Sequence, residues 1–148
     1  MNGRLLNKKL HNQLGFTLLE LLVVIAVIGV LASLAVPRLQ SQVQRARFVD
    51  VINSTAPYKA GVEMCFQRTG GLATCTPATS ADVPANNQLV NANVGSQVVG
   101  AAGVITATGT LASGNGAALT YTLTPAAAAG AGGVTWVAAG TCLAAGFC

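Results

Sequence analysis

Side chains that could carry out acid–base chemistry or bind a metal are few in this sequence. The acidic residues are Glu20, Asp50, Glu63 and Asp82, and the histidine is His11. The 66 residues from position 83 to position 148 contain no Lys, Arg, Asp or Glu. General acid–base catalysis and the binding of hard cations both need such groups. We therefore expect no catalytic residue, no metal site and no cofactor.

Glu20 is the one charged residue in an apolar stretch of 21 residues, positions 16–36. At about 1.5 Å per residue, a helix of this length measures roughly 30 Å, the thickness of a bilayer's hydrocarbon core. Three basic residues precede the stretch, Arg4, Lys8 and Lys9. Positive charge on this side favours a cytoplasmic N-terminus, so the residues after the stretch should lie outside the cytoplasm.

Two ordinary interpretations of the stretch are available. It could be a cleaved secretory signal, because Ser33-Leu34-Ala35 offers a small-x-small cleavage site. It could instead be a simple membrane anchor. An anchor gains nothing from Glu20, since an acidic side chain at helix-centre depth costs roughly 2.5 to 3.5 kcal/mol.

A third interpretation rests on Gly15-Phe16-Thr17-Leu18-Leu19-Glu20. Behind a short basic leader and ahead of an apolar run, this motif resembles the processing site of type IV prepilins. The resemblance implies that a prepilin peptidase cuts after Gly15, removes the leader 1–15 and methylates the new amino terminus of Phe16. Glu20 matches the family's acidic residue one helical turn into the mature chain, and Pro37 matches its helix proline. The likeness is specific over residues 15–37 and only architectural beyond them.

The spacing of Phe16 and Glu20 supports a role for the carboxylate. Residues four apart lie on one face of a helix, and an acidic side chain in the first turn complements the helix dipole. Dipole complementation alone would explain the residue. The resemblance implies more, namely that Glu20 compensates the cationic amino terminus of a neighbouring subunit when the helices pack into a fibre. In a low-dielectric bundle such a pair sets register as well as affinity.

Gly29 and Pro37 are the two helix-weakening positions of this segment. Gly29 and Ser33 form a small-xxx-small step that allows close helix approach. Gly29 costs about 1 kcal/mol against alanine and Pro37 about 3 kcal/mol. We expect an intact, gently kinked helix in the free subunit. The resemblance implies that the segment between them loosens on assembly.

Residues 38–68 read as an amphipathic helix. Apolar side chains recur at Val43, Ala46, Val49, Ile52 and Ala56, which predicts a covered face. We expect Pro57 to kink this helix without ending it, because Tyr58, Val62, Cys65 and Phe66 resume the pattern before Gly70 and Gly71. The basic residues are interpreted as a solvated face with Arg47 near Asp50 and Lys59 near Glu63, rather than as a ligand site; they are Arg38, Arg45, Arg47, Lys59 and Arg68.

The rest of the chain predicts a loop followed by a small sheet. Residues 70–93 lack periodicity and read as a loop. Residues 119–124 alternate apolar residues with threonine, which predicts a half-buried strand. A strand over residues 104–111 should precede it across a turn at 113–116, and a strand over residues 134–138 should follow it after a connector rich in glycine and alanine. We expect three or four antiparallel strands, with Tyr121 and Trp136 as core anchors against the amphipathic helix.

Four cysteines complete the list of reactive side chains: Cys65, Cys75, Cys142 and Cys148. An exported chain meets oxidising conditions, and a small head has a limited core, so disulfides rather than a metal site are expected. The sequence does not decide among the three possible pairings. We favour Cys65 with Cys75 and Cys142 with Cys148, because both close short loops, worth roughly 2 to 3 kcal/mol each. The resemblance also implies a C-terminal disulfide that frames an exposed variable surface.

These patterns and the resemblance predict an α+β pilin fold that follows a cleaved leader, residues 1–15. A long helix, residues 16–68, has a first half, 16–36, that spans the membrane and polymerises, and an amphipathic second half, 37–68. Residues 69–148 form a β head that disulfides stabilise. With 52% hydrophobic and 8% charged residues, the composition is unlike that of a soluble enzyme. Loss of the leader would leave five basic and four acidic side chains, so a basic surface for nucleic acid is absent.

The resemblance implies a structural subunit, a major pilin that forms a homopolymeric helical filament on the cell surface. Implied partners are the prepilin peptidase, an inner-membrane assembly platform with its ATPase, and an outer-membrane secretin. Subunits would wait in the inner membrane before assembly, and adhesion, twitching motility and DNA uptake are the family's outputs. A pseudopilin of a type II secretion system and a minor DNA-binding pilin are the alternatives.

Overall fold

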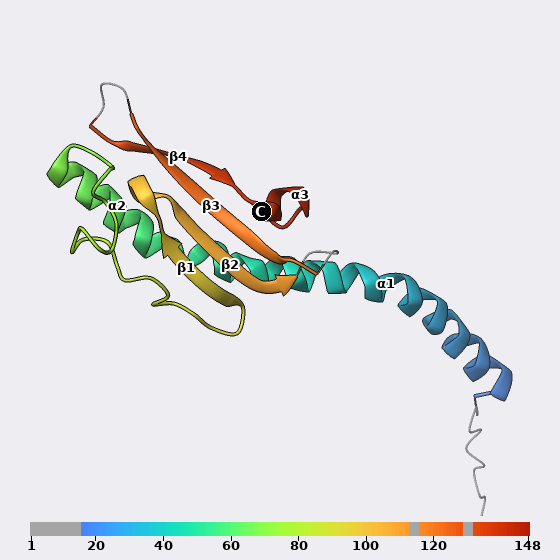
Figure 1. Ribbon diagram of the computed structural model, residues 1–148. Coiled ribbons are helices and arrows are strands. Elements are labelled where there is room, and N and C mark those ends of the chain that lie inside the picture. Colours follow the sequence, from blue (N-terminus) through green and yellow to red (C-terminus); the bar gives the residue numbers. More distant parts are fainter. Residues whose placement is uncertain (1–15, 113–115, 129–131) are drawn as a thin grey trace, which may run out of the picture. The chain divides into compact units, whose positions relative to one another are not determined.

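The structure, a computed structural model, describes residues 16–112, 116–128 and 132–148, and gives the backbone but not the side chains of residues 37 and 38. The chain forms two compact units, Met1–Leu39 and Gln40–Cys148. The elements in chain order are α1 (Leu18–Asn53), α2 (Ala56–Thr69), β1 (Val94–Val99), a 3-10 turn η1 (Ala101–Gly103), β2 (Ile105–Ala112), β3 (Ala118–Ala127), β4 (Val134–Ala139) and α3 (Thr141–Ala144) (Figure 1).

The described part of the first unit is the N-terminal part of α1. The helix starts where the Thr17 hydroxyl accepts a hydrogen bond from the backbone N–H of Glu20, at 3.2 Å. Such a bond satisfies one of the donors left free at a helix start. The backbone stays helical through Pro37, as expected for the free chain. The helical stretch Leu18–Thr69 contains the one candidate membrane span in the described ranges, and none of that apolar window is buried.

In the second unit, a two-residue turn at Ser54 and Thr55 separates α1 from α2, and the helical stretch continues to Thr69, in agreement with the expectation that Pro57 kinks the helix without ending it. Pro57 has no N–H for the carbonyl four residues earlier and its ring crowds that carbonyl, so it fits the first turn of a new helix better than a helix interior. The Ser54 and Thr55 hydroxyls donate to the carbonyls of Val51 and Ile52, at 2.7 Å each. The interruption therefore leaves these carbonyls satisfied.

The covered face of α1 differs from the predicted one. Val43 and Val49 are 49% and 46% exposed, Ala46 and Ala56 are exposed, and Ile52 is half-buried. In α1 the buried side chains are instead Phe48 and Val51, whereas Tyr58, Val62 and Cys65 of α2, which the predicted pattern included, are buried as expected. Both rows of α1 have helical spacing. The row with the larger aromatic side chain, Phe48, is the buried one because it covers more apolar area.

The sheet is an antiparallel meander in the order β1-β2-β3-β4, which confirms the predicted α+β architecture of a long helix on three or four strands. In β3, Leu119 and Leu123 are buried and Tyr121 is partly buried, as the alternation predicted. Pro125 is tolerated in this central strand because the position of its missing N–H faces η1, beyond the end of the β2 pairing. The predicted turn at 113–116 lies mostly outside the described residues.

Two apolar clusters fill the space between helices and sheet. One joins Tyr58 and Val62 of α2 to Ile105 and Leu123, and Trp136 packs against its edge. The other joins Phe48 and Val51 of α1 to β1, β2, β3 and Cys142. Each fully buried apolar side chain contributes roughly 1.5 to 3 kcal/mol, so these clusters hold the helices and the sheet together.

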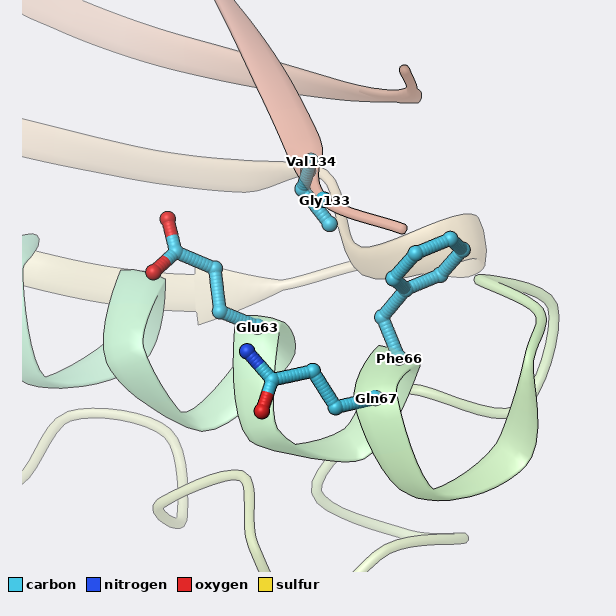
Figure 2. A pocket seen from close by; sticks show the side chains of 5 residues that line it. All are labelled: Glu63, Phe66, Gln67, Gly133 and Val134. Carbon is cyan, nitrogen blue, oxygen red and sulfur yellow. The ribbon is translucent and has the colours of Figure 1, made fainter. Parts of the chain in front are cut away.

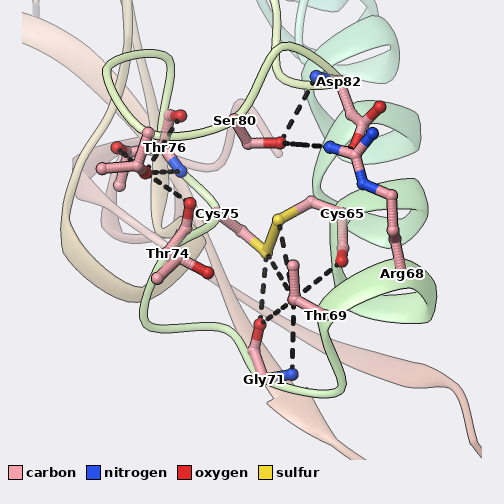
Figure 3. Close-up of polar contacts among 10 residues, drawn as sticks. Cys65, Arg68, Thr69, Gly71, Thr74, Cys75, Thr76, Ser80 and Asp82 are labelled. Carbon is pink, nitrogen blue, oxygen red and sulfur yellow. Dashed lines mark hydrogen bonds and ion pairs between the residues drawn. A yellow bond between two sulfur atoms is a disulfide. The ribbon is translucent and has the colours of Figure 1, made fainter.

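The loop after α2 contacts that helix at three points, and Figure 3 shows two of them, a disulfide and an ion pair. Cys65 and Cys75 form a disulfide, and Arg68 forms an ion pair with Asp82. At Gly61 an added Cβ would lie 2.5 Å from the carbonyl oxygen of Asp82, so only glycine permits this approach. The irregular segment predicted for residues 70–93 is thus ordered against α2 rather than free.

The C-terminal segment is fastened in a similar way. Cys142 in α3 forms a disulfide with Cys148, and the Phe147 ring meets the Phe48 ring edge to face with centroids 6.2 Å apart. The two disulfides are the pairing that the short loops favoured. Together with the Phe147–Phe48 contact, the second one fixes the chain end on the part of α1 that carries Phe48.

Candidate functional site

The residues predicted for processing and assembly lie at the start of the described chain. Gly15 falls outside the described residues. Phe16 precedes α1 and is 82% exposed, and Glu20 lies exposed in the first helical turn. At Gly29 an added Cβ would meet no heavy atom within 4 Å, so the chain itself does not use the space above it. Pro37 continues the helical backbone.

The first part of α1 presents an apolar surface that the chain leaves uncovered. The side chains over residues 16–36 are all exposed, among them Leu18, Leu22, Ile28 and Leu34 at 87%, 63%, 58% and 67%. Exposed apolar surface of this extent marks a membrane or protein contact. Within it, the Glu20 carboxylate has no ion-pair partner among the described residues. The arrangement can insert into a bilayer or pack against like helices, and Glu20 is the charged residue that it carries within residues 16–36.

In the head, the charged side chains pair differently from the predicted local pairs. Asp50 accepts a hydrogen bond from the Asn93 side chain at 2.6 Å, rather than forming an ion pair with Arg47. Glu63 accepts a hydrogen bond from Trp136 Nε1 at 2.7 Å, and Lys59 Nζ lies 5.6 Å from the centroid of the Trp136 ring. Neither predicted ion pair forms among the described residues. Trp136 is an anchor, as expected, through a polar contact as well as through packing.

A small cavity lies beside this contact (Figure 2). It measures about 230 Å³ and is lined by Glu63, Phe66, Gln67, Gly133 and Val134. The first three side chains come from α2, and the last two residues lie at the start of β4. This site was not predicted from the sequence. The spacing of Glu63 and Gln67 places them on one helix face, but nothing local in the sequence indicates that β4 lies beside them.

The Arg68 region was also missed. Arg68 pairs with Asp82, and the Ser80 hydroxyl lies within hydrogen-bond distance of both, 3.4 Å from Arg68 Nη2 and 3.2 Å from Asp82 Oδ2 (Figure 3). The Thr69 hydroxyl donates to the Cys65 carbonyl at 2.8 Å beside the disulfide. These contacts hold the loop against α2. Because the side chains of Arg68, Ser80 and Asp82 interact with one another, we assign this region a structural role.

Comparison with known proteins adds to this geometry. Residues 10–36 match the family model described as the prokaryotic N-terminal methylation motif. The type IV pilus subunit protein TapA of Aeromonas hydrophila is 37% identical over 76 residues, 51% of this chain and 54% of the relative. The chain is therefore similar to type IV pilus subunits. This supports the prepilin interpretation of the leader and of the apolar stretch, over the signal peptide and the simple anchor.

Other pilin relatives match in the same way. The fimbrial protein EcpC of Eikenella corrodens is 38% identical over 96 residues, 65% of this chain and 62% of the relative. The type IV major fimbrial protein FimA of Dichelobacter nodosus is 40% identical over 53 residues, 36% of this chain and 34% of the relative. The chain thus spans about half the length of the first relative, and 62% and 34% of the length of these two.

Proposed function

We propose that this pilin-related chain is the major structural subunit of a type IV pilus. In this proposal the prepilin peptidase removes residues 1–15 and methylates Phe16, and residues 16–36 hold the subunit in the inner membrane. The helix then polymerises into a homopolymeric filament, through an assembly platform, its ATPase and a secretin. The exposed filament would serve adhesion, twitching motility or DNA uptake.

One observation carries the proposal. The residues that match the methylation motif, 10–36, include the first part of α1, whose apolar side chains are all exposed. A surface of this kind suits two successive environments, the bilayer before assembly and the packed helices of a fibre afterwards. The relatives named as pilus and fimbrial subunits support the same role. In this role Gly29, Pro37 and Glu20 act in helix packing, and the second unit is the exposed head.

The test is the identity and the amino terminus of the main subunit in sheared surface filaments. We expect this chain to be the most abundant protein there, and mass spectrometry to find an N-methylated Phe16 as its first residue. Gly15→Leu should leave uncut precursor in the inner membrane and no filaments, whereas Gly3→Leu, in the same leader but away from the junction, should be processed normally.

Two outcomes would contradict the proposal. A mature chain starting at Val36 would show that an ordinary signal peptidase had acted. Filaments that contain the chain only as a rare component would point to a minor pilin, a role that one relative's name also carries, the probable minor fimbrial protein of Dichelobacter nodosus, 43% identical over 58 residues. A chain absent from filaments but required for protein secretion would be a pseudopilin.

A further inference from the structure

The two edges of the sheet differ in how their backbone groups are satisfied. At β1, the N–H of Val99 donates to Asn86 Oδ1 and the N–H of Gln97 donates to Asn87 Oδ1, at 2.9 Å each. The backbone N–H of Asn87 donates in turn to the carbonyl of Gln97, at 2.9 Å. The loop before β1 therefore closes this edge, and no further strand can pair there without displacing it.

The opposite edge, β4, is open (Figure 1). The bond from the N–H of Ala128 to the carbonyl of Gly133, at 2.9 Å, fixes the phase of the β3–β4 ladder. Because hydrogen-bonded pairs alternate in antiparallel strands, the residues of β4 that turn their backbone groups outward are Val134, Trp136 and Ala138. These outward groups have no hydrogen-bond partner among the described residues.

The β4 edge also lacks the features that usually prevent strand addition. Its six residues contain no charged side chain and no proline, and its register with β3 is continuous, without a bulge. Edge strands that proteins keep unpaired normally carry one of these features. The contrast with β1, which is closed by two asparagines, indicates that the open edge is available to a partner strand.

A pocket lies next to this edge, and the two share a residue. The side chain of Val134 lines the cavity of about 230 Å³ (Figure 2). Val134 is also the first residue of β4 whose backbone N–H and C=O point away from β3. Side chains of an added strand alternate between the two faces of the sheet. A side chain on the helix-facing side of such a strand, opposite Val134, would enter the cavity between β4 and α2.

The lining of the pocket selects the charge of that side chain. Glu63 supplies a carboxylate that accepts one hydrogen bond, from Trp136, and can accept others. The side-chain amide of Gln67 lies one helical turn away, and Phe66 and Val134 supply apolar walls. Lys59 lies over the Trp136 ring and forms no ion pair with Glu63. A long aliphatic side chain with a cationic end complements this lining.

We propose that the β4 edge binds an extended segment of a second protein, which adds to the sheet as a fifth strand and places a lysine or arginine side chain in the pocket beside Glu63. Backbone hydrogen bonds to Val134, Trp136 and Ala138 supply affinity, and the pocket supplies selectivity, as in other cases of strand addition. This surface belongs to the head and is independent of polymerisation through the N-terminal helix.

The proposal is testable with the full chain in detergent micelles and synthetic peptides. The probes are seven-residue peptides of alternating threonine and valine with arginine, norleucine or glutamate at the centre. Trp136 is the chain's single tryptophan, so its fluorescence reports binding at β4 directly. We expect the arginine peptide to bind most tightly and the glutamate peptide least. Amide exchange measured by NMR should slow at Val134, Trp136 and Ala138, and stay unchanged at Gln97 and Val99.

Two variants separate the pocket from the edge. Glu63→Gln keeps an acceptor for Trp136 and should weaken the arginine peptide about threefold, the size of an exposed ion pair, without affecting the norleucine peptide. Ala138→Pro removes one outward N–H and should weaken all peptides, whereas Ala138→Ser keeps the N–H and should bind normally. If Ala138→Pro does not fold, the amide pattern and Glu63→Gln decide the question.

Several results would overturn the proposal. These are the absence of binding up to the solubility of the arginine peptide, equal affinity for arginine and glutamate peptides, no effect of Glu63→Gln, and protection at β1 in place of β4. Protection of the β4 amides at rising protein concentration without peptide would assign the edge to a second copy of this chain instead.

Discussion

Glu20 could act within its own helix or between subunits. Its backbone N–H is bound by the Thr17 hydroxyl, and its exposed carboxylate lies in the first turn, where it complements the helix dipole. Neither role explains why an acid is placed in a segment suited to a bilayer, where an acidic side chain is unfavourable, by roughly 2.5 to 3.5 kcal/mol at the helix centre and by less near the helix start. A cationic amino terminus that arrives with a neighbouring subunit would offset this cost.

Replacing Glu20 separates these roles. We expect Glu20→Ala and Glu20→Gln to insert into the membrane at least as well as the parent chain, because replacing a charged side chain in an apolar helix lowers the free energy of insertion. Filaments should nevertheless be few. When Glu20→Gln is coexpressed with the parent chain, quantitative mass spectrometry should find it under-represented in filaments relative to the membrane, whereas Glu63→Gln, which deletes a charge in the head, should enter in proportion. Proportional entry of Glu20→Gln would leave only the helix-dipole role.

At the scale of elements, α2 and the loop that follows it meet at Gly61. A Cβ there would lie 2.5 Å from the Asp82 carbonyl oxygen and 2.8 Å from Pro84 Cδ. Backbone and a proline ring cannot move aside as the end of a flexible side chain can. The close approach therefore depends on glycine, although glycine in a helix interior costs about 0.5 to 1 kcal/mol relative to alanine.

We expect Gly61→Ala to lower the free energy of unfolding by about 1 to 2 kcal/mol, since overpacking outweighs the gain in helix propensity. Gly71→Ala is the matched control, because an added Cβ there meets nothing within 4 Å, and it should change stability by less than about 0.5 kcal/mol. Thermal unfolding followed by circular dichroism of the head's secondary structure measures both. Equal midpoints for the two variants would show that the loop can retreat from α2.

The elements predicted from sequence are those whose pattern is local. Strict alternation of Leu119, Tyr121 and Leu123 with threonines identifies β3, because a strand has period two. β1 gave no such pattern, since Gly95 interrupts it and the register shifts between Val94 and Ser96. The buried face predicted for α1 was wrong because two apolar rows of equal spacing exist there, and only the sheet decides which is covered; for α2, the predicted Tyr58, Val62 and Cys65 are buried.

The residues of the candidate site also fall into two groups, those that a local motif identified and those that only the fold brings together. The residues from Phe16 to Glu20 stand in a continuous motif, so sequence alone brought them together. The contacts of Glu63 with Trp136 and of Asp50 with Asn93 join residues 73 and 43 positions apart. From local spacing, the expected partners of Asp50 and Glu63 were basic residues on the same helix. Local spacing does not show that Asn93 and Trp136, from a loop and from the sheet, lie beside these carboxylates in the folded chain.

For the whole molecule, the two disulfides fix segments that a small core would hold weakly. Cys65–Cys75 joins α2 to the loop after it, and Cys142–Cys148 holds the chain end where Phe147 meets Phe48. Both close short loops, with sequence separations of 10 and 6. Their main effect is to restrict the unfolded chain, worth roughly 2 to 3 kcal/mol each in the loop-closure account.

Removing each disulfide tests this account. Paired alanine replacements, Cys65→Ala with Cys75→Ala and Cys142→Ala with Cys148→Ala, should each lower the free energy of unfolding by about 2 to 3 kcal/mol. Alanine avoids placing an unpaired hydroxyl in the core, where both Cys65 and Cys142 are fully buried. Urea titrations of oxidised protein provide the measurement, with dithiothreitol added to the parent chain as the reference for losing both. Midpoints equal to that of the oxidised parent would show that packing alone holds these segments.

The order of the strands in the meander also affects the rate at which the sheet can fold. Every strand pairs with the one made just before it, so no pairing waits for a distant part of the chain. Low separation between pairing partners shortens the search that limits the folding rate of β proteins. The packing of the sheet and the C-terminal segment on the helix is different, because Phe48 meets Phe147 and shares a cluster with Cys142, positions about 100 residues away. Closing such long loops costs more chain entropy than closing the hairpins, so we expect the strands to pair before the head closes over α1.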